Sequence, residues 1–285
     1  MDLIRDAIRA VVKRPFILVF VSALMLAAAI FNVIIPVMAM IVGIIKMTGG
    51  GFFDSILSVI QVLIDPSSLI TILITLAVLA LLLSAAAGLL LPGYILIVND
   101  GLNKGRKIEG LVAEGIRNSF LKFFVMTLKT TLITAVFAIF LLISAVPAII
   151  VSKAAFGTKP DLMLAAVFID IVTVCVFFLS LSFFRIYISM WYAAAAFNEE
   201  KPFKTGKAAG DRCFWSVAMG YLCFDIVFSA VIFLIYQSGS QLFRYGAGWV
   251  FASLFFAVLA VFILRSYRNS FIEENRGEDI EDGLE

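Results

Sequence analysis

Histidine is absent from this chain of 285 residues, and charged residues make up only 15% of it. Without histidine the chain cannot build a Ser-His-Asp triad, histidine acid–base catalysis or a histidine metal site. Its three cysteines share no short metal-ligand spacing, and two of them fall inside apolar runs. We interpret them as apolar filler rather than as redox or metal-binding groups. No catalytic residue, metal or cofactor is therefore expected, and the chain is not expected to be an enzyme.

Hydrophobic residues, in contrast, account for 62% of the chain, and the mean hydropathy is +1.08. Soluble domains are about half apolar and about a quarter charged, so a water-soluble fold could not cover this much apolar surface. A helix that spans a bilayer needs about 20 mostly apolar residues. The sequence predicts an all-α, multi-pass membrane protein whose six spans cover residues 15–45, 68–91, 123–151, 162–197, 214–236 and 245–264. Together they form a single transmembrane domain over residues 1–265.

Proline marks two features of these predicted spans. Pro36 has no N–H to donate and leaves the carbonyl of Asn32 without its helical partner, so we expect a kink between them. Pro92, followed by Gly93, is expected to close the second span.

The first apolar run continues too far for a cleaved signal peptide, which favours an uncleaved anchor.

The basic residues are distributed unevenly between the two sides of the membrane. Of the 22 lysines and arginines, sixteen lie on the side of the N-terminus, four lie on the opposite side, and Lys129 and Arg185 fall within spans. Because basic loops remain in the cytoplasm, both termini are expected there. Loops of this kind determine topology, so we infer no nucleic-acid partner from them.

Three segments in which apolar residues recur at helical spacing precede the three outward spans, at residues 2–14, 108–122 and 202–213. We expect each to be an amphipathic helix at the cytoplasmic interface, with basic residues toward anionic headgroups. The chain would then consist of three hairpins, each preceded by such a helix.

Two further segments lie outside the predicted spans. A fourth amphipathic stretch, residues 52–64, is expected to lie on the outer leaflet or cap the bundle, and the alternative is a gate over an external vestibule. The acidic tail, residues 266–285, is expected to be cytoplasmic, and its acidic part to be disordered.

Ionisable side chains inside a bilayer are costly, so they usually pair or line a polar cavity. At 1.5 Å per residue, Lys129, Asp170 and Asp225 fall within a few ångströms of one central layer of a core that is about 30 Å thick. The sequence therefore offers these three residues as a candidate intramembrane polar centre, whose functional interpretation is a cation or proton site.

Structural roles remain open for each of these charges. The two aspartates could instead bind hydroxyls such as those of Thr173 or Ser229, or pair with Lys129 to join helices. Lys129 could extend to the interface. Arg185 is expected near the inner boundary, where it would reach lipid headgroups.

The opening Val12-Lys13-Arg14-Pro15-Phe16, followed by the recurring amphipathic segment and span, resembles a set of prokaryotic six-span membrane families. They are related to the membrane domain that accompanies some glycerophosphodiester phosphodiesterases. The resemblance covers the plan of residues 1–265 and carries no catalytic residue, since the phosphodiesterase site belongs to a separate soluble domain. It implies a protein of the prokaryotic cytoplasmic membrane.

Two classes of function fit these observations best. The leading hypothesis is a permease-like or transport-associated protein. The alternative is a structural or assembly protein of the membrane whose partners are lipids and another membrane protein or a second copy. An intramembrane lipid enzyme comes third, because the sequence offers no nucleophile–base pair.

The predicted topology has a direct test. A reporter that is active only in the cytoplasm, fused after Glu285, should be active, because an even number of spans returns the chain to the side of its N-terminus. The same reporter inserted after Lys159 should be inactive. Activity in the opposite pattern would overturn the topology.

Overall fold

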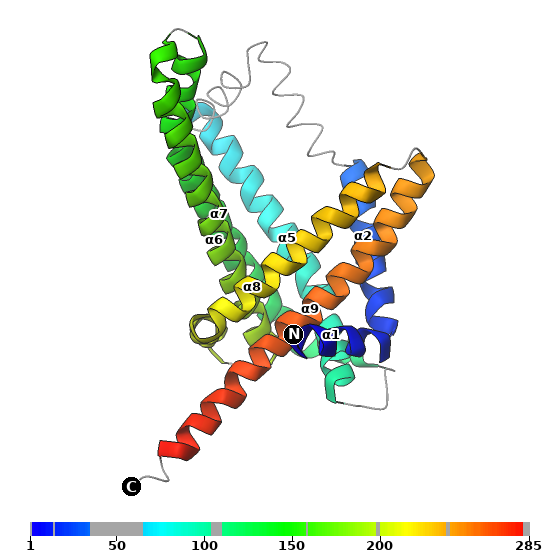
Figure 1. Cartoon of the computed structure of the whole chain (residues 1–285). Coiled ribbons are helices and arrows are strands. Elements are labelled where there is room, and N and C mark those ends of the chain that lie inside the picture. Colours follow the sequence, from blue (N-terminus) through cyan, green and yellow to red (C-terminus); the bar gives the residue numbers. More distant parts are fainter. Residues whose placement is uncertain are drawn as a thin grey trace. The chain divides into compact units, whose positions relative to one another are not determined.

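The computed structural model describes residues 2–13, 15–34, 65–103, 110–157, 159–197, 200–237 and 240–281, and within these ranges it contains helices and no strand. The elements are α1 (Asp2–Lys13), α2 (Pro15–Ile34), α5 (Pro66–Asn103), α6 (Leu111–Gly157), the short 3-10 helix η1 (Pro160–Leu162), α7 (Met163–Ala196), α8 (Pro202–Tyr236) and α9 (Gln241–Glu281) (Figure 1). The predicted all-α class is confirmed.

Five of the described helices are long and apolar enough to cross a membrane, over Leu73–Val98, Val112–Gly157, Pro160–Ala196, Pro202–Tyr236 and Phe243–Ser270. This gives the chain the character of a multi-pass membrane protein. The first expected span contributes the shorter apolar helix Pro15–Leu26. Pro36, the rest of that span and the amphipathic stretch 52–64 lie outside the described residues, so six spans remain a prediction.

Two helices continue beyond the ends that the sequence predicts. Helix α5 passes through Pro92 and ends at Asn103 instead of closing before the Pro-Gly pair. A proline inside a membrane helix frees only one carbonyl, which neighbouring groups can satisfy. Helix α9 continues through Glu281, so the acidic tail, which the sequence predicts to be disordered, is helical as far as that residue. No proline interrupts it, and its polar residues are compatible with a helix that is already formed.

The chain divides into two compact units. Unit 1 consists of residues 1–30, 88–123 and 184–285, and unit 2 consists of residues 31–87 and 124–183. Helices α5, α6 and α7 each contribute residues to both units. The single transmembrane domain over residues 1–265 stays a prediction.

The core of unit 1 lies where α8 and α1 pack against α9 (Figure 1). Aromatic rings fill the contact between α8 and α9: Phe224 meets Phe262 with ring centroids 5.3 Å apart, and Phe228 meets Phe255 at 4.7 Å. Tyr267 of α9 is almost fully buried and stacks on Phe197. Such ring pairs stabilise helix packing beyond the effect of their area alone.

The three predicted amphipathic segments of unit 1 join their spans in three different ways. Helix α1 buries Ala7 and Val11 in the core while Arg5 and Arg9 stay exposed, and it is separate from α2. In α8 the backbone at Cys213 is non-helical, with φ −101° and ψ 15°, so the helix bends where the amphipathic part meets the span. In α6 the two parts form one continuous helix.

Glycines allow the first turns of α8 to approach α7 closely. A Cβ atom added to Gly206 would lie 2.8 Å from the carbonyl oxygen of Met190 and from the Cα atom of Trp191. A Cβ atom on Gly210 would lie 3.1 Å from the ring of Tyr187. Two small residues four positions apart are typical of such tight helix contacts in membranes. This contact aligns α7 with α8 and thereby positions the site described below.

The close approach at Gly206 predicts an asymmetric effect of two identical substitutions. Gly206→Ala should lower the free energy of unfolding by about 1–3 kcal/mol, because its methyl group meets backbone atoms that must shift. Gly246→Ala in α9 meets nothing within 4 Å and should be neutral or stabilising by up to about 1 kcal/mol. Thermal denaturation in a mild detergent measures both, and equal values would contradict the packing argument.

Candidate intramembrane polar site

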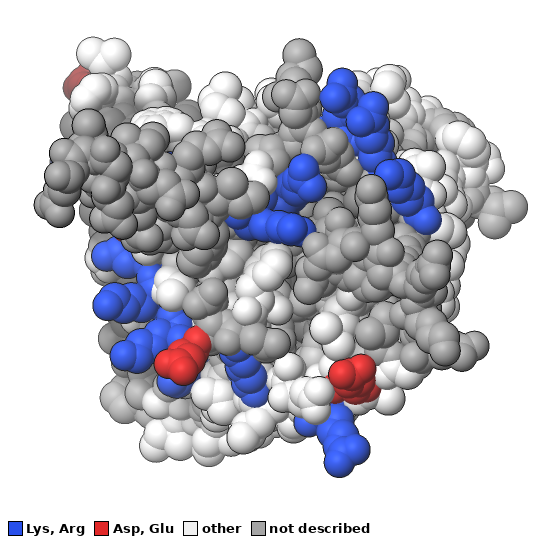
Figure 2. Space-filling model, turned by 90° about the horizontal axis from the view of Figure 1, so that it is seen from below, with Lys and Arg blue, Asp and Glu red and all other residues white. Residues whose placement is uncertain are grey.

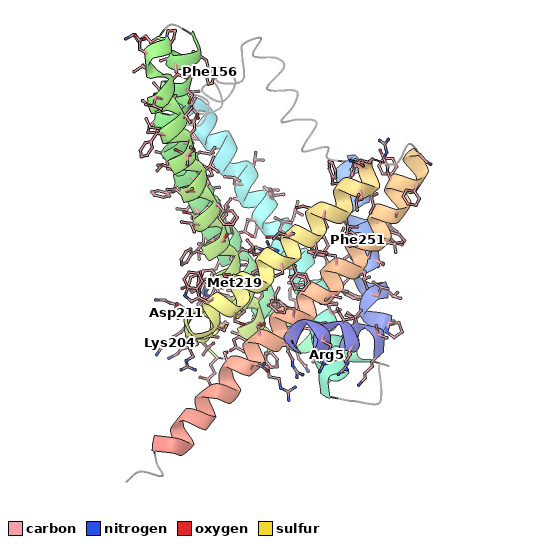
Figure 3. The ribbon with its side chains drawn as sticks, viewed as in Figure 1. Arg5, Phe156, Lys204, Asp211, Met219 and Phe251 are labelled. Carbon is pink, nitrogen blue, oxygen red and sulfur yellow. The ribbon has the colours of Figure 1, made fainter. Side chains whose placement is uncertain are left out.

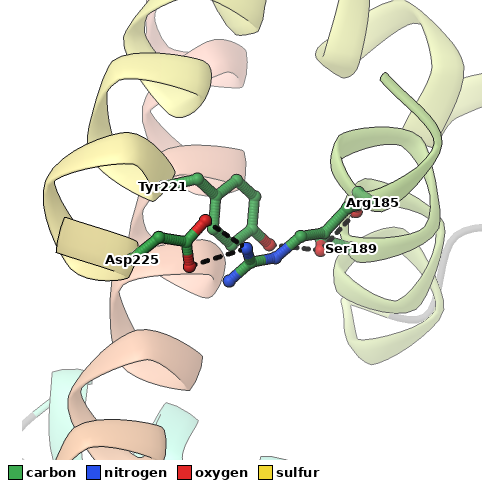
Figure 4. A network of polar contacts seen from close by, with 4 residues as sticks. All are labelled: Arg185, Ser189, Tyr221 and Asp225. Carbon is green, nitrogen blue, oxygen red and sulfur yellow. Dashed lines mark hydrogen bonds and ion pairs between the residues drawn. The ribbon is translucent and has the colours of Figure 1, made fainter. Parts of the chain in front are cut away.

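Helices α7 and α8 of unit 1 are joined by an ion pair between Arg185 and Asp225 (Figure 4). The Nη1 atom of Arg185 donates to both carboxylate oxygens, at 2.8 Å to Oδ1 and 2.7 Å to Oδ2. A charge-assisted hydrogen bond of this kind is stronger than a neutral one. Both residues lie in helices that are apolar enough to cross a membrane, where each charge needs a partner.

Tyr221 supports the pair from one side. Its ring lies under the guanidinium group, with 4.0 Å between the Cζ atom of Arg185 and the ring centroid, which is a cation–π contact. The Tyr221 side chain is buried, and its hydroxyl is hydrogen-bonded to the hydroxyl of Ser189. Ser189 donates its own hydrogen to the carbonyl oxygen of Arg185 at 2.7 Å. Because a serine has one O–H, Tyr221 must be the donor in the bond between the two hydroxyls.

The helical repeat explains why these four residues meet. Arg185 and Ser189 are four residues apart on α7, and Tyr221 and Asp225 are four residues apart on α8. Residues with this spacing lie on the same face of a helix. Helices α7 and α8 are joined by a short connection and run in opposite directions. Their two faces therefore meet at two successive helical turns, Arg185 with Asp225 and Ser189 with Tyr221 (Figure 4).

A further contact lies on the other side of the bend at Cys213. The hydroxyl of Tyr187 donates to Oδ1 of Asp211 at 2.5 Å, and Asp211 belongs to the amphipathic start of α8. Tyr187 and Ser189 are two residues apart, whereas their partners on α8 are ten residues apart. The bend in α8 thus allows one short segment of α7 to form hydrogen bonds with α8 on both sides of Cys213.

The ion pair is only partly covered. The side chain of Arg185 is 39% exposed and that of Asp225 is 53% exposed. Around Asp225 the neighbouring positions of α8 are apolar and exposed, as Leu222, Ile226 and Val227 show. The site is therefore a polar point on an apolar helix surface, with Tyr221 and Ser189 behind it.

Lys129 and Asp170, both of unit 2, are not brought together. Asp170 accepts a hydrogen bond of 2.8 Å from the hydroxyl of Ser152 on α6. Lys129 is also on α6 and lies 23 residues before Ser152, which corresponds to about 34 Å along the helix axis. The prediction that they share one layer is therefore wrong for this pair. It fails because the two depths were counted from opposite ends of helices that are longer than a bilayer is thick.

Sequence reasoning did not find the partner of Asp225. It placed Arg185 at the inner boundary and Asp225 near the centre, yet the ion pair requires them at one depth. A usable signal was present in the chain. Arg185 lies 12 residues before the end of its predicted span at Phe197, and Asp225 lies 11 residues after the start of its span at Phe214, so both are about 17 Å from the connected ends of the two spans. Tyr221 and Ser189 carried no comparable signal.

Within the described ranges, no three cysteine, aspartate or glutamate side chains lie close enough together to hold a metal ion. No protein-family model, curated protein or solved structure matches this chain. The function of the site is consequently inferred from its own geometry.

The ion pair predicts that its two members are energetically coupled. Asp225→Asn and Arg185→Gln should each lower the free energy of unfolding by about 1–3 kcal/mol, because each leaves one charge in an apolar helix without its partner. The double variant should lose less than the sum of the two. Asp161→Asn, at an exposed position of η1, is the matched control and should change little. Additive losses in thermal denaturation would contradict the coupling.

Proposed function

We propose that this protein is a permease-like or transport-associated membrane protein whose polar centre is the Arg185–Asp225 pair with Tyr221 and Ser189. In this proposal the exposed side of the pair borders a hydrated passage. The observation that supports it is the partial exposure of both charges on an apolar helix surface. Asp225 thereby keeps the role that the sequence suggests, while Arg185 takes the place of Lys129 as the nearby cation.

The cost of exposing charge to hydrocarbon favours this function. A charged pair in an apolar environment is stable only when its remaining donors and acceptors are satisfied. Arg185 uses Nη1 for both contacts to Asp225, so the pair does not have the two-nitrogen fork that would engage the guanidinium more fully. Lipid chains offer no hydrogen bonds to the exposed side, whereas water or a polar solute offers many.

A structural or assembly role is the second candidate, and the same ion pair is the observation that favours it. Two contacts at successive helical turns join α7 to α8, the ion pair of Arg185 with Asp225 and the hydrogen bond of Ser189 with Tyr221. Contacts of this kind would hold the two helices together in a structural protein. The exposed side of the pair would then contact a polar group of a partner protein rather than water. The two candidates differ in whether water reaches Asp225.

Reactivity of substituted cysteines measures this access of water. In a background with Cys175, Cys213 and Cys223 replaced by alanine, Ser229→Cys puts a thiol one helical turn from Asp225 on the same exposed face of α8. Val227→Cys, which is exposed on a different face of this helix, is the matched control. The probe is a charged, membrane-impermeant thiol reagent, added outside proteoliposomes or enclosed within them.

A hydrated passage predicts that Ser229→Cys reacts at least about tenfold faster than Val227→Cys, because only a thiolate reacts and a thiol facing hydrocarbon does not ionise. Both variants should react equally after denaturation in detergent. Ser229→Cys that stays as unreactive as Val227→Cys from both sides of the membrane would overturn the passage and favour the structural role.

A further inference from the structure

An apolar cavity lies in unit 1 between α5, α7 and α9, close to the ion pair but distinct from it. Its volume is about 320 Å³, and it is lined mainly by leucine, isoleucine and alanine side chains, among them Ala193, Ala260 and Leu264. Ligand sites for small molecules have about 300–1,000 Å³ and combine apolar walls with a few polar groups. The cavity therefore has the size and the lining of a site for part of one hydrocarbon chain.

One hydroxyl of this cavity has no partner. Tyr94 lines the cavity and is 6% exposed, and within the described part of the chain its Oη atom is buried without a hydrogen bond. Its ring is held by stacking on Phe20, with 5.3 Å between the ring centroids. The hydroxyl of Ser189, which also lines the cavity, is already engaged by Arg185 and Tyr221. Because buried hydroxyls are normally paired, the Tyr94 hydroxyl is available to donate to an acceptor oxygen of a molecule bound in the cavity.

Basic side chains gather at the same end of unit 1. Leu264 of the cavity directly precedes Arg265, and Arg268 follows within one turn of α9. Arg5 of α1 and Lys204 of α8 lie at this end as well (Figure 3). On the face drawn in Figure 2, lysine and arginine side chains predominate over aspartate and glutamate. A basic surface beside an apolar cavity is complementary to an anionic headgroup with an attached acyl chain.

We propose that this cavity binds one acyl chain of an anionic phospholipid from the adjacent leaflet. The ester carbonyl of the lipid accepts the hydrogen bond of the Tyr94 hydroxyl, the chain fills the space between Ala193 and Ala260, and the headgroup meets the basic surface. The site does not depend on the proposed passage. Lipid binding can fail while Ser229→Cys still reacts with the aqueous reagent, and the reverse result is equally observable.

Native mass spectrometry of the full chain, purified in mild detergent and stripped of lipid, tests the site. The probes are dioleoyl phosphatidylglycerol, dioleoyl phosphatidylcholine and oleic acid, added separately. Phosphatidylglycerol should bind most tightly, because the other two lack either the net negative charge or the complete headgroup. Binding of oleic acid without binding of phosphatidylglycerol would overturn the phospholipid assignment, as would equal binding of both phospholipids.

Two variants locate the binding. Ala260→Phe, which fills the cavity, should weaken binding of phosphatidylglycerol at least about tenfold, whereas Ala247→Phe, in the same helix but outside the lining, should not. Tyr94→Phe keeps the ring and removes only the hydroxyl, so binding should weaken about threefold to tenfold. Equal binding by Ala260→Phe and Ala247→Phe would overturn the site.

A thermal measurement keeps the test decisive if Ala260→Phe does not fold. In the lipid-free protein, Tyr94→Phe should melt at the same temperature as the unmodified chain or higher, because the lost hydroxyl has no partner there. Phosphatidylglycerol should then raise the melting temperature of the unmodified chain more than that of Tyr94→Phe. An equal rise in both proteins would overturn the role of the hydroxyl.

Discussion

Hydrocarbon provides no hydrogen bonds, and this constraint governs both the backbone and the charges of the molecule. Every regular element of the described residues is a helix, which satisfies its N–H and carbonyl groups internally. The same constraint applies to the few charges within the spans. Arg185 is paired with Asp225, and Asp170 accepts from Ser152, so each aspartate has a partner on the neighbouring helix. Both pairs join helices that follow one another along the chain, α6 with α7 and α7 with α8.

The bounds of α7 and the bend of α8 are predictable from the sequence, because charged or turn residues lie beside their apolar runs. Helix α7 ends within one residue of both predicted bounds, and the bend of α8 falls at Cys213, where the predicted amphipathic segment ends. The predicted end at Pro92 is wrong, because a single proline does not terminate a membrane helix that neighbouring residues support. The predicted disorder of the acidic tail is also wrong, because composition alone does not show that a preceding helix can continue.

The polar site was harder to predict than the helices, since it depends on the register between them. Helix α6 has 47 residues and is about 70 Å long, more than twice the thickness of a hydrocarbon core. A depth counted from one end of such a helix is therefore ambiguous, which is why the sequence predicts one layer for Lys129 and Asp170 although the structure separates them. Helices α7 and α8 share one short connection, so depths along both can be counted from that common point without ambiguity. Counted in this way, Arg185 and Asp225 lie at the same depth, as their ion pair requires.

Ser189 belongs to both features of unit 1. Its hydroxyl is bonded to Tyr221 behind the ion pair, and its side chain also lines the apolar cavity. Because α7 turns once every 3.6 residues, Arg185, Ser189 and Ala193 follow one another along a single stripe of that helix. The stripe passes from the charged Arg185 through the hydroxyl of Ser189 to the apolar Ala193 of the cavity lining. One face of α7 therefore lines the cavity with Ser189 and Ala193 and supports the ion pair with Ser189, so the two sites share a wall while remaining separate.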